Sequence, residues 1–379
     1  MAPLSHFLVS LLAAGAFALP QDASVAGRPG PGGPPSPPPP PPPPPPAPPC
    51  KPKDIRVRKA WHTLSNTEKK AYIDAELCLM SKPTRLHLRG ARTIFDDFQS
   101  AHVSLTEIVH YAGQFLPYHR LFVWAHEEAL RRECGYRGAQ PYWNETQDAG
   151  SFSTSVVLDP TTGFGGNGVG ASRCIVDGPF ANYTNSLGPG YLINDHCIDR
   201  SVTDFVSWAA HKQYADRCLA KSDWLSFWTC VEAAPHTSGH AGIGSQMTNP
   251  ISSPGDPIFY LHHAYLDMLW AKWQALNPSV RLTEMGGKNL GNLAVEFPGE
   301  LFPTDIPPPP GFNPGAGGGG PPVVDVTRPA DVPQPLISGD PGNTTTLNHK
   351  LQMLGLTQDR TVGQVMNTKG GYLCYEYDQ

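Results

Sequence analysis

The chain has few charged side chains and no marked excess of either sign. Of its 379 residues 16% are charged, and 28 Lys and Arg against 33 Asp and Glu leave a net charge of -5. A surface that holds a nucleic-acid backbone needs a basic field, and this composition provides none. We therefore expect no nucleic-acid partner.

The chain also lacks an apolar run long enough to cross a membrane. The longest one, residues 7–18, has twelve residues, whereas a spanning helix needs about 18. Its length and the small residues at its end are typical of a secretory signal, although no Lys or Arg precedes it. We interpret 1–19 as a cleaved signal peptide and predict a secreted, extracellular protein with no membrane partner. The alternative is a buried N-terminal helix, which the proline tract that follows would separate from any core.

Cysteine pairs with zinc-binding spacing are missing as well. The chain has eight cysteines but no CxxC and no Cys/His cluster of that kind. Together with an export signal, this favours structural disulfides whose connectivity stays open at this point. Three Asn-x-Ser/Thr sequons, at Asn144, Asn182 and Asn343, are compatible with glycosylation of a secreted protein.

Of the 43 prolines, 17 lie in 20–49 and 12 in 303–342, and the second stretch also holds 8 of the 38 glycines. Residues 20–49 are predicted to be a disordered Pro-rich segment, and 303–342 a Pro/Gly-rich surface loop or linker inside a body that spans 50–379. We find no internal repeat. Strand-like runs are short and few, and helical periodicity predicts a mainly α domain with long irregular loops. The expected helices cover 65–80, which opens on a Ser-x-x-Glu capping pattern, and 117–134, 204–215 and 257–275.

Seven of the 14 histidines fall into two groups: His102, His110 and His119, and His236, His240, His262 and His263. A single histidine is most often a satisfied surface or core residue. Two groups within aromatic helical sequence instead favour metal binding.

The spacing within each group supports this interpretation. His110 and His119, nine residues apart, would lie on opposite sides of one helix, but Gly113 and Pro117 interrupt it. We expect His119 in the first turn of a new helix and His110 on the loop before it.

In the second group Pro235 can open a helix that places His236 and His240, at i and i+4, on one side. His262 and His263 differ by about 100° in direction on a helix, so we expect only one of them to point at the site.

The ligand types select the metal. Six neutral imidazoles without cysteine or carboxylate suit copper better than zinc or iron, and no HExxH motif of zinc hydrolases is present. Two sites of three histidines predict a pair of copper ions that share one O₂.

Longer motifs carry a resemblance to a known family. HYAGQFLPYHRLFVWAHE at 110–127 and DPIFYLHHAYLDMLW at 256–270 resemble the two copper-binding motifs of type-3 copper proteins. QPYWNETQDAG at 140–150, PHTSGH at 235–240 and GYLCYEYD at 371–378 extend the resemblance over nearly all of 50–379. The pattern is most similar to short secreted fungal tyrosinases and catechol oxidases, or polyphenol oxidases. The resemblance implies a helical bundle around a dinuclear copper site.

Carried over position by position, the resemblance implies one copper bound by His102, His110 and His119 and the other by His236, His240 and His263. His263 is preferred to His262 because the family ligand stands four residues before the Asp of HHxxxD, here Asp267. That Asp is expected to orient a ligand imidazole. A similar support is expected of Glu127, whose alternative is an exposed helix carboxylate, and Phe259 is expected to pack between the copper-binding helices.

Two departures from the family pattern are visible. Some members cross-link a cysteine to a histidine of the first site, but no cysteine stands directly before His102 or His110. The family's PYW is usually followed by Asp-Trp, whereas this chain has Asn144 and Glu145. The second departure changes the local packing and touches no expected ligand.

The resemblance implies a copper-dependent oxidation of o-diphenols to o-quinones, with O₂ reduced to water and a small phenol as the other partner. Monophenols are expected to react weakly, because Thr237 stands where many monophenol-hydroxylating members have an Asn that holds a water together with a glutamate, here Glu232. Any oxidation of o-aminophenols is also expected to be weak. Thr237 could instead merely cap or pack its helix. The alternatives are a full tyrosinase with strong monophenol monooxygenase activity and a haemocyanin-like O₂ carrier. Longer family members cover the site with a C-terminal domain that follows a Tyr-x-Tyr motif. Here only two residues follow Tyr377, so no such cover is expected, and this favours an enzyme over the carrier. Oligomeric state stays open.

The resemblance also implies one disulfide. In the family a Tyr-x-Tyr motif, here Tyr375 and Tyr377, docks near an arginine close to the N-terminus. Cys374 precedes that motif and Cys50 precedes Arg56 and Arg58. We therefore predict a Cys50–Cys374 bridge.

Overall fold

The structure is a computed structural model that describes residues 50–293, 301–303, 305, 307–313, 326–335, 340 and 344–378. The chain separates into two units, Met1–Pro41 and Pro42–Gln379, and every described residue belongs to the second. The predicted signal peptide and Pro-rich segment, residues 1–49, lie outside the described residues. None of the described helices is long and apolar enough to span a membrane.

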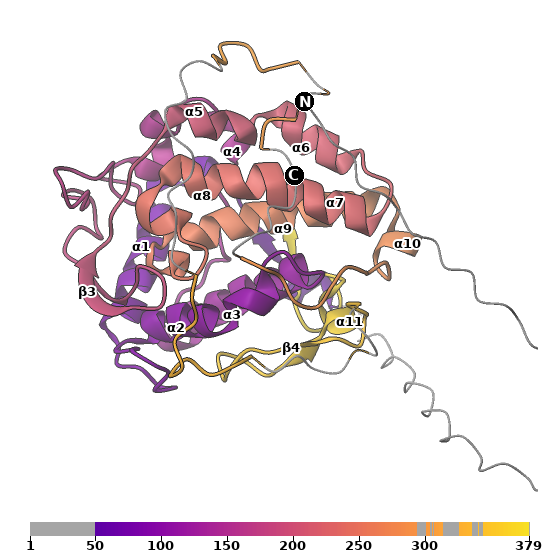
Figure 1. Cartoon of the computed structure of the whole chain (residues 1–379), viewed down its shortest axis with the longest axis horizontal. Coiled ribbons are helices and arrows are strands. Elements are labelled where there is room, and N and C mark those ends of the chain that lie inside the picture. Colours follow the sequence, from indigo (N-terminus) through magenta and orange to yellow (C-terminus); the bar gives the residue numbers. More distant parts are fainter. Residues whose placement is uncertain are drawn as a thin grey trace, which may run out of the picture. The chain divides into compact units, whose positions relative to one another are not determined.

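The fold is mainly α, as predicted (Figure 1). The α-helices are α1 (Asn66–Ser81), α2 (Ile94–Val109), α3 (Phe115–Cys134), α4 (Glu145–Asp148), α5 (Asp204–Ser207), α6 (Lys212–Leu219), α7 (Trp224–Val231), α8 (Thr237–Ile243), α9 (Ile258–Leu276), α10 (Pro278–Arg281) and α11 (Val362–Val365). Short 3₁₀ helices cover Pro52–Asp54, Trp61–Thr63, Phe152–Thr154, Val156–Leu158, Trp208–Ala210, Ser245–Thr248 and Ser253–Gly255, and a π-helical segment, η6, covers Glu232–His236.

The strands pair two by two and build no larger sheet among the described residues. β1 (Arg56–Arg58) lies parallel to β6 (Tyr375–Tyr377), with Arg58 opposite Tyr377. β2 (Thr184–Leu187) and β3 (Ile193–Cys197) are antiparallel, as are β4 (Lys350–Leu351) and β5 (Arg360–Thr361). The β1–β6 pair joins the start of the described body to its end.

Three predicted helices are present with small shifts. Ser65 caps α1, its side chain accepting from the Glu68 backbone while the Glu68 side chain accepts from the Ser65 N–H, which is the predicted capping box. α3 begins two residues before Pro117, and α9 begins directly after Pro257. The long α2, α3 and α9 carry most of the core, and α3 packs against α1, α2 and α9.

Two helix predictions are wrong. The continuous helix expected over 204–215 is broken into α5, a 3₁₀ turn and α6, because His211 takes an extended backbone and its side chain accepts from the Gln213 N–H at the start of α6. Pro235 does not open a helix. It lies inside η6, which joins α7 to α8 in one helical run, seen in line in Figure 1. α2 and α7 are not among the predicted helices.

All eight cysteines are paired, and the predicted Cys50–Cys374 bridge is confirmed. The other bridges are Cys78–Cys134, Cys174–Cys197 and Cys218–Cys230. Since Cys50 and Cys374 are 324 residues apart, closing this loop limits the unfolded chain and stabilises the fold by on the order of 5 kcal/mol in the chain-entropy account.

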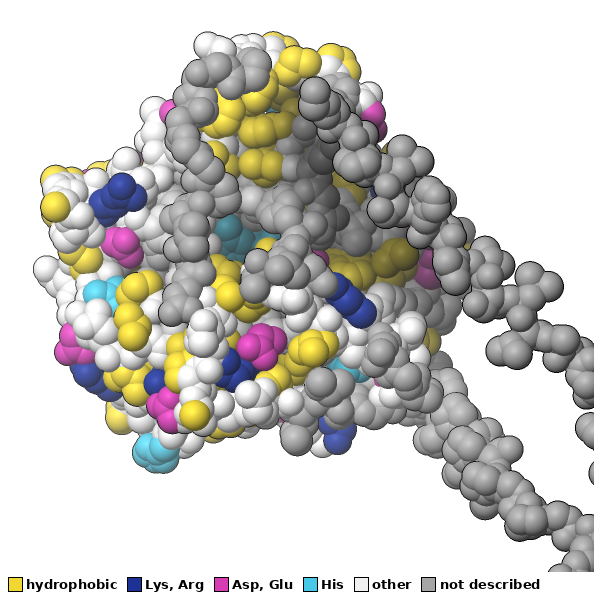
Figure 2. Space-filling view, viewed as in Figure 1, with side chains coloured by type: hydrophobic (Ala, Val, Ile, Leu, Met, Phe, Trp, Pro, Cys, Tyr) yellow, Lys and Arg dark blue, Asp and Glu magenta, His cyan; other side chains and the backbone are white. Residues whose placement is uncertain are grey.

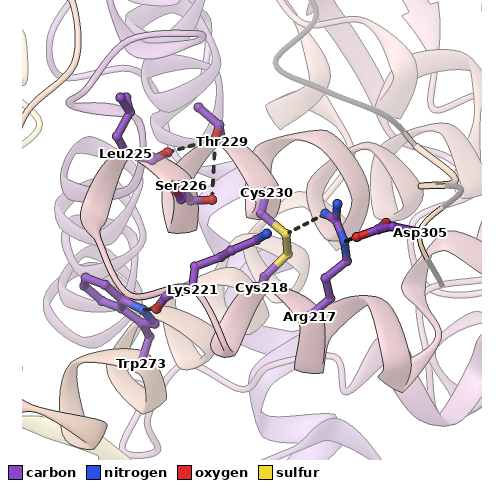
Figure 3. Close-up of a disulfide and its surroundings, with 9 residues drawn as sticks. All are labelled: Arg217, Cys218, Lys221, Leu225, Ser226, Thr229, Cys230, Trp273 and Asp305. Carbon is purple, nitrogen blue, oxygen red and sulfur yellow. Dashed lines mark hydrogen bonds and ion pairs between the residues drawn. A yellow bond between two sulfur atoms is a disulfide. The ribbon is translucent and has the colours of Figure 1, made fainter.

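Described parts of the Pro/Gly-rich stretch lie against the body. Asp305 pairs with Arg217 on α6 at 3.0 Å, next to the Cys218–Cys230 bridge that joins α6 to α7 (Figure 3). Phe312 stacks on Phe205 of α5 at 5.3 Å between ring centroids. Because Cys230 is close to the end of α7, the Cys218–Cys230 bridge fixes this helix immediately before η6, which leads into the second histidine group.

Candidate metal centre

The first histidine group comes from two adjacent helices. His102 lies in the middle of α2, His110 directly follows its last residue, and His119 lies in the second turn of α3. The ring centroids are 5.0 to 5.7 Å apart and all three side chains are buried. The chain break expected between His110 and His119 is what allows them to face each other.

The second group comes from the continuous α7–η6–α8 run and from α9. His236 ends η6, His240 lies on α8, and their centroids are 4.5 Å apart. His262 and His263 both join them, and one ligand-capable nitrogen from each of the four lies within 4.8 Å of the others. Both rings of the adjacent pair lie in the group, although their directions on the helix differ by about 100°. α9 passes close enough to α8 to place both rings there.

The closest ring contact between the two groups is a stack of two imidazoles. His119 and His263 lie 4.2 Å apart at an interplanar angle of 11°. Phe259 lies 4.2 Å from His263 and 5.3 Å from His102, so it packs between the helices as expected. The two groups form one buried centre lined by imidazole and phenyl rings.

Most of the candidate ligands are held by the backbone. The Nδ1 atoms lie within hydrogen-bond distance of carbonyl oxygens: His102 of Ile251 at 2.9 Å, His110 of Thr106 at 2.9 Å, His119 of Phe115 at 2.8 Å, His236 of Glu232 at 3.3 Å and His240 of Met247 at 2.6 Å. An Nδ1–H donated in this way leaves the Nε2 lone pair for another partner.

Several Nε2 atoms of the two groups are buried and lack a hydrogen bond. Those of His102, His119 and His236 are buried without a hydrogen-bond partner among the described residues. Burial is the main cause that lowers the pKa of every histidine in both groups, to about 4 for His110, and neighbouring imidazoles lower most of them further. Neutral imidazoles with orphaned nitrogens are what copper binds, so the residues fit a metal pair.

Asp267 does not orient a ligand imidazole, contrary to the sequence expectation. Its carboxylate binds Arg120 at 2.5 Å and Arg58 at 3.4 Å and accepts from the hydroxyls of Tyr375 and Tyr377. Although burial opposes it, the two arginines hold the pKa of Asp267 below its ordinary value. The His263 Nδ1 meanwhile has no hydrogen-bond partner among the described residues. Two buried cations outcompete one neutral ring for this carboxylate.

Glu127 neither supports a ligand imidazole nor is exposed, contrary to both expectations. It is fully buried and pairs with Arg56 at 2.6 Å and Arg58 at 2.8 Å, so it touches no candidate ligand. Arg58 in turn lies over the ring of Tyr375, 3.5 Å from its centroid. The expected docking of the Tyr-x-Tyr motif near an N-terminal arginine is thereby confirmed.

Glu232 and Thr237 lie beside the second group. The buried Glu232 carboxylate accepts from the backbone N–H of Tyr111 and from the indole N–H of Trp228, both at 2.7 Å. The Thr237 hydroxyl donates to the backbone carbonyl of Glu232 at 3.2 Å, within the continuous helical run. Thr237 and His236 are half-buried rather than buried, and Figure 2 shows histidine side chains at the bottom of a hollow bordered by hydrophobic ones.

The sequence of this chain is similar to a known family and to known proteins. The family described as the common central domain of tyrosinase matches residues 92–276. A tyrosinase-like protein of Diaporthe leptostromiformis is 32% identical over 85% of this chain and 79% of its own length. A tyrosinase of Aspergillus flavus is 31% identical over 86% and 80%.

A solved structure agrees with these relatives. A polyphenol oxidase variant from Thermothelomyces thermophila superposes with a TM-score of 0.67 at 29% identity, covering 88% of this chain and 91% of that one. Enzymes of this family act on O₂ and phenolic substrates, and the family implies a dinuclear copper centre. The chain therefore belongs to the tyrosinase family and is an oxidoreductase of the type-3 copper class.

Proposed function

We propose that this chain oxidises o-diphenols to o-quinones and reduces O₂ to water. Two diphenols give up four electrons and four protons, which convert one O₂ into two water molecules. One copper is held by His102, His110 and His119 and the other by His236, His240 and His263. The observation that carries the proposal is the pair of buried imidazole groups, with orphaned Nε2 atoms, that meet at the His119–His263 stack.

When bound, the copper pair supplies the one-electron steps and the binding of O₂. The protein itself holds the imidazoles in place and keeps water out of the centre. Backbone carbonyls fix five of the six imidazoles, and Phe115 and Phe259 lie against the rings of both groups. A phenol ring that reaches this centre leaves water for a largely apolar surface.

We further propose that catechol-type substrates react strongly and monophenols weakly. Hydroxylating a monophenol requires removal of its proton at the metal, for which a well-oriented water is needed. Glu232 already accepts from Tyr111 and Trp228, and the Thr237 hydroxyl donates to a backbone carbonyl. These bonds support a limited role for both residues in orienting a water.

The test is oxygen uptake by copper-loaded protein with catechol, a simple monophenol and an o-aminophenol. We expect fast uptake with catechol, slow uptake with the other two and two diphenols consumed per O₂. Equally fast uptake with the monophenol, without a lag, would establish the full-tyrosinase alternative. O₂ binding without consumption of any phenol would establish a carrier and overturn the proposal.

We also propose that the protein is exported to the extracellular space. Eight cysteines that all pair in four bridges support an oxidising compartment. N-terminal sequencing of protein secreted by a fungal host tests this, and we expect the mature chain to begin close to residue 20. Protein retained inside the cell with residues 1–19 intact would contradict it.

A further inference from the structure

A small cluster of buried apolar side chains is separate from the main core. Its four members are at most 5% exposed: Val103, Tyr191, Ile251 and Val332. Val332 comes from residues 326–335, a described part of the Pro/Gly-rich stretch. The family's common central domain matches residues 92–276 and does not include this segment. The cluster therefore brings a segment from outside that domain against residues within it.

Two members of the cluster are directly connected to a candidate ligand of the first metal site. Val103 follows His102 on α2, and the backbone carbonyl of Ile251 lies 2.9 Å from Nδ1 of His102. An Nδ1–H donated to this carbonyl fixes the ring and leaves Nε2 for a metal. A shift of Ile251 would therefore turn the His102 ring. Because Ile251 is fully buried, its position depends on the side chains that pack against it.

The residue before Ile251 supports a second ligand of the same site. The Thr106 hydroxyl donates to the backbone carbonyl of Pro250 at 2.9 Å, and the Thr106 carbonyl lies 2.9 Å from Nδ1 of His110. Pro250 and Ile251 together thus hold the supports of two of the three candidate ligands of the first site.

Two arginines hold the Pro/Gly-rich stretch in this place. Arg328, whose side chain is 5% exposed, pairs with Glu107 of α2 at 3.2 Å. Arg89, in the loop before α2, pairs with Asp331 at 2.7 Å. Since Asp331 directly precedes Val332, the second ion pair fixes the backbone from which the Val332 side chain enters the cluster.

We propose that Val332 is a positioning residue for the first metal site. Its packing in the cluster keeps the Ile251 carbonyl on Nδ1 of His102 and so keeps Nε2 of that ring directed to the metal. The proposal rests on the dinuclear copper site of the proposed function, with three histidines at each copper. It gives the Pro/Gly-rich stretch a part in holding the first copper but not the second.

The copper affinity of each site on its own tests the proposal without an activity measurement. In the full chain, His240→Ala leaves only the first site complete, and His102→Ala leaves only the second. Competition with a chelator then gives one affinity in each background. We expect Val332→Ala to weaken copper binding by about tenfold in the His240→Ala chain and to leave it unchanged in the His102→Ala chain. An unchanged affinity in both backgrounds, or an equal loss in both, would overturn the proposal.

Val157→Ala separates an effect on the site from a loss of fold. Val157 is 1% exposed and Val332 2%, but Val157 belongs to the main core, on the 3₁₀ helix Val156–Leu158. It should lower the midpoint of denaturant unfolding and change neither copper affinity. A tenfold loss at the first site in Val157→Ala as well would show that any core truncation has this effect, and would overturn the proposal.

Asp331→Asn is a second variant, which leaves the buried cluster intact. It removes the ion pair with Arg89 at a side chain that is 63% exposed. We expect weaker copper binding at the first site alone, by less than in Val332→Ala, and a loss confined to the second site would contradict the proposal. An unmodified chain that binds fewer than two coppers would contradict the proposed function instead.

Discussion

The Glu232 carboxylate accepts a hydrogen bond at 2.7 Å from the backbone N–H of Tyr111, the residue that follows His110. Glu232 belongs to the same helical segment as His236, so this bond ties the second histidine group to the chain that carries the first. Tyr111 has a φ of 50°, a conformation unusual for a tyrosine, and the bond helps to hold it. The spacing between the two groups therefore depends partly on Glu232.

This relationship predicts the effect of Glu232→Gln. A glutamine can accept only one of the two N–H donors with its oxygen, and its NH₂ then faces the other. We expect a loss of about 1–3 kcal/mol in the free energy of unfolding and weaker binding of both coppers. Denaturant unfolding and copper titration measure the two effects. A variant of native stability that loses only monophenol activity would show that Glu232 acts through a bound water instead.

Copper content tests the centre itself. Elemental analysis of protein matured with copper should give two coppers per chain, and a coupled Cu(II) pair should be silent in EPR. His263→Ala should abolish diphenol oxidation, whereas His262→Ala should leave part of it. The reverse order of the two variants would mean that His262 is the principal ligand from α9. One copper per chain, or zinc alone, would contradict the assignment.

The buried cluster around Asp267 predicts an acid-sensitive fold. A lowered pKa means that Asp267 stabilises the folded state above its ordinary pKa, and that this contribution is lost as the pH falls through the lowered value. Asp267→Asn leaves Arg120 without its carboxylate and should cost about 3–5 kcal/mol near neutral pH. The deficit should shrink toward low pH. Thermal unfolding of both proteins between pH 7 and pH 3 measures it, and a pH-independent deficit would contradict the electrostatic account.

Two sequons differ sharply in exposure. Asn182 is exposed just before β2, whereas Asn144 is 8% exposed and its side-chain oxygen accepts from Thr146 at 2.7 Å. We expect a glycan on Asn182 and none on Asn144 in protein secreted by a eukaryotic host. Peptide mass mapping before and after enzymatic deglycosylation decides this. A glycan on Asn144 would mean that the sequon is modified before this region folds.

Local signals in the sequence account for most of what could be predicted. The capping box at Ser65 and the chain break between His110 and His119 depend on neighbouring residues, and both are visible in the sequence. A similar box at Thr93 and Asp96 opens α2 and could have revealed that helix. The partners of Asp267 could not be predicted this way. Its carboxylate lies one helical turn beyond His263 and could contact that ring, but it pairs with Arg120 and Arg58, which are far away in the sequence.

The same limit applies to the adjacent histidines. A helical wheel separates His262 and His263 by about 100°, but it cannot show that α8 has a glycine facing them or that Glu145 lies 117 positions earlier within reach. The family motif selects His263, and only the tertiary arrangement shows that His262 is also held in the group.

The residue after the first histidine of the second group should govern which phenols react. Thr237 is half-buried beside His236, and its hydroxyl donates to the Glu232 carbonyl, which restricts how it can hold a water. In Thr237→Asn the amide reaches further and offers both a donor and an acceptor, so a water can be oriented to take the phenol proton. We expect the ratio of monophenol to diphenol turnover to rise by about tenfold or more, with diphenol oxidation little changed.

Thr229→Asn is the matched control for this change. Thr229 also donates its hydroxyl to a backbone carbonyl, that of Leu225 at 2.8 Å, but on the exposed side of α7. Its replacement should leave the ratio of monophenol to diphenol turnover as in the unmodified enzyme, since the Thr229 hydroxyl bonds to the carbonyls of Leu225 and Ser226 on its own helix (Figure 3). Steady-state oxygen uptake with a monophenol and its catechol, measured on both variants, separates a specific effect at 237 from a general effect of asparagine in this helical run. An unchanged ratio in Thr237→Asn would mean that Thr237 only caps its helix, and the preference for diphenols would then have to come from access to the centre.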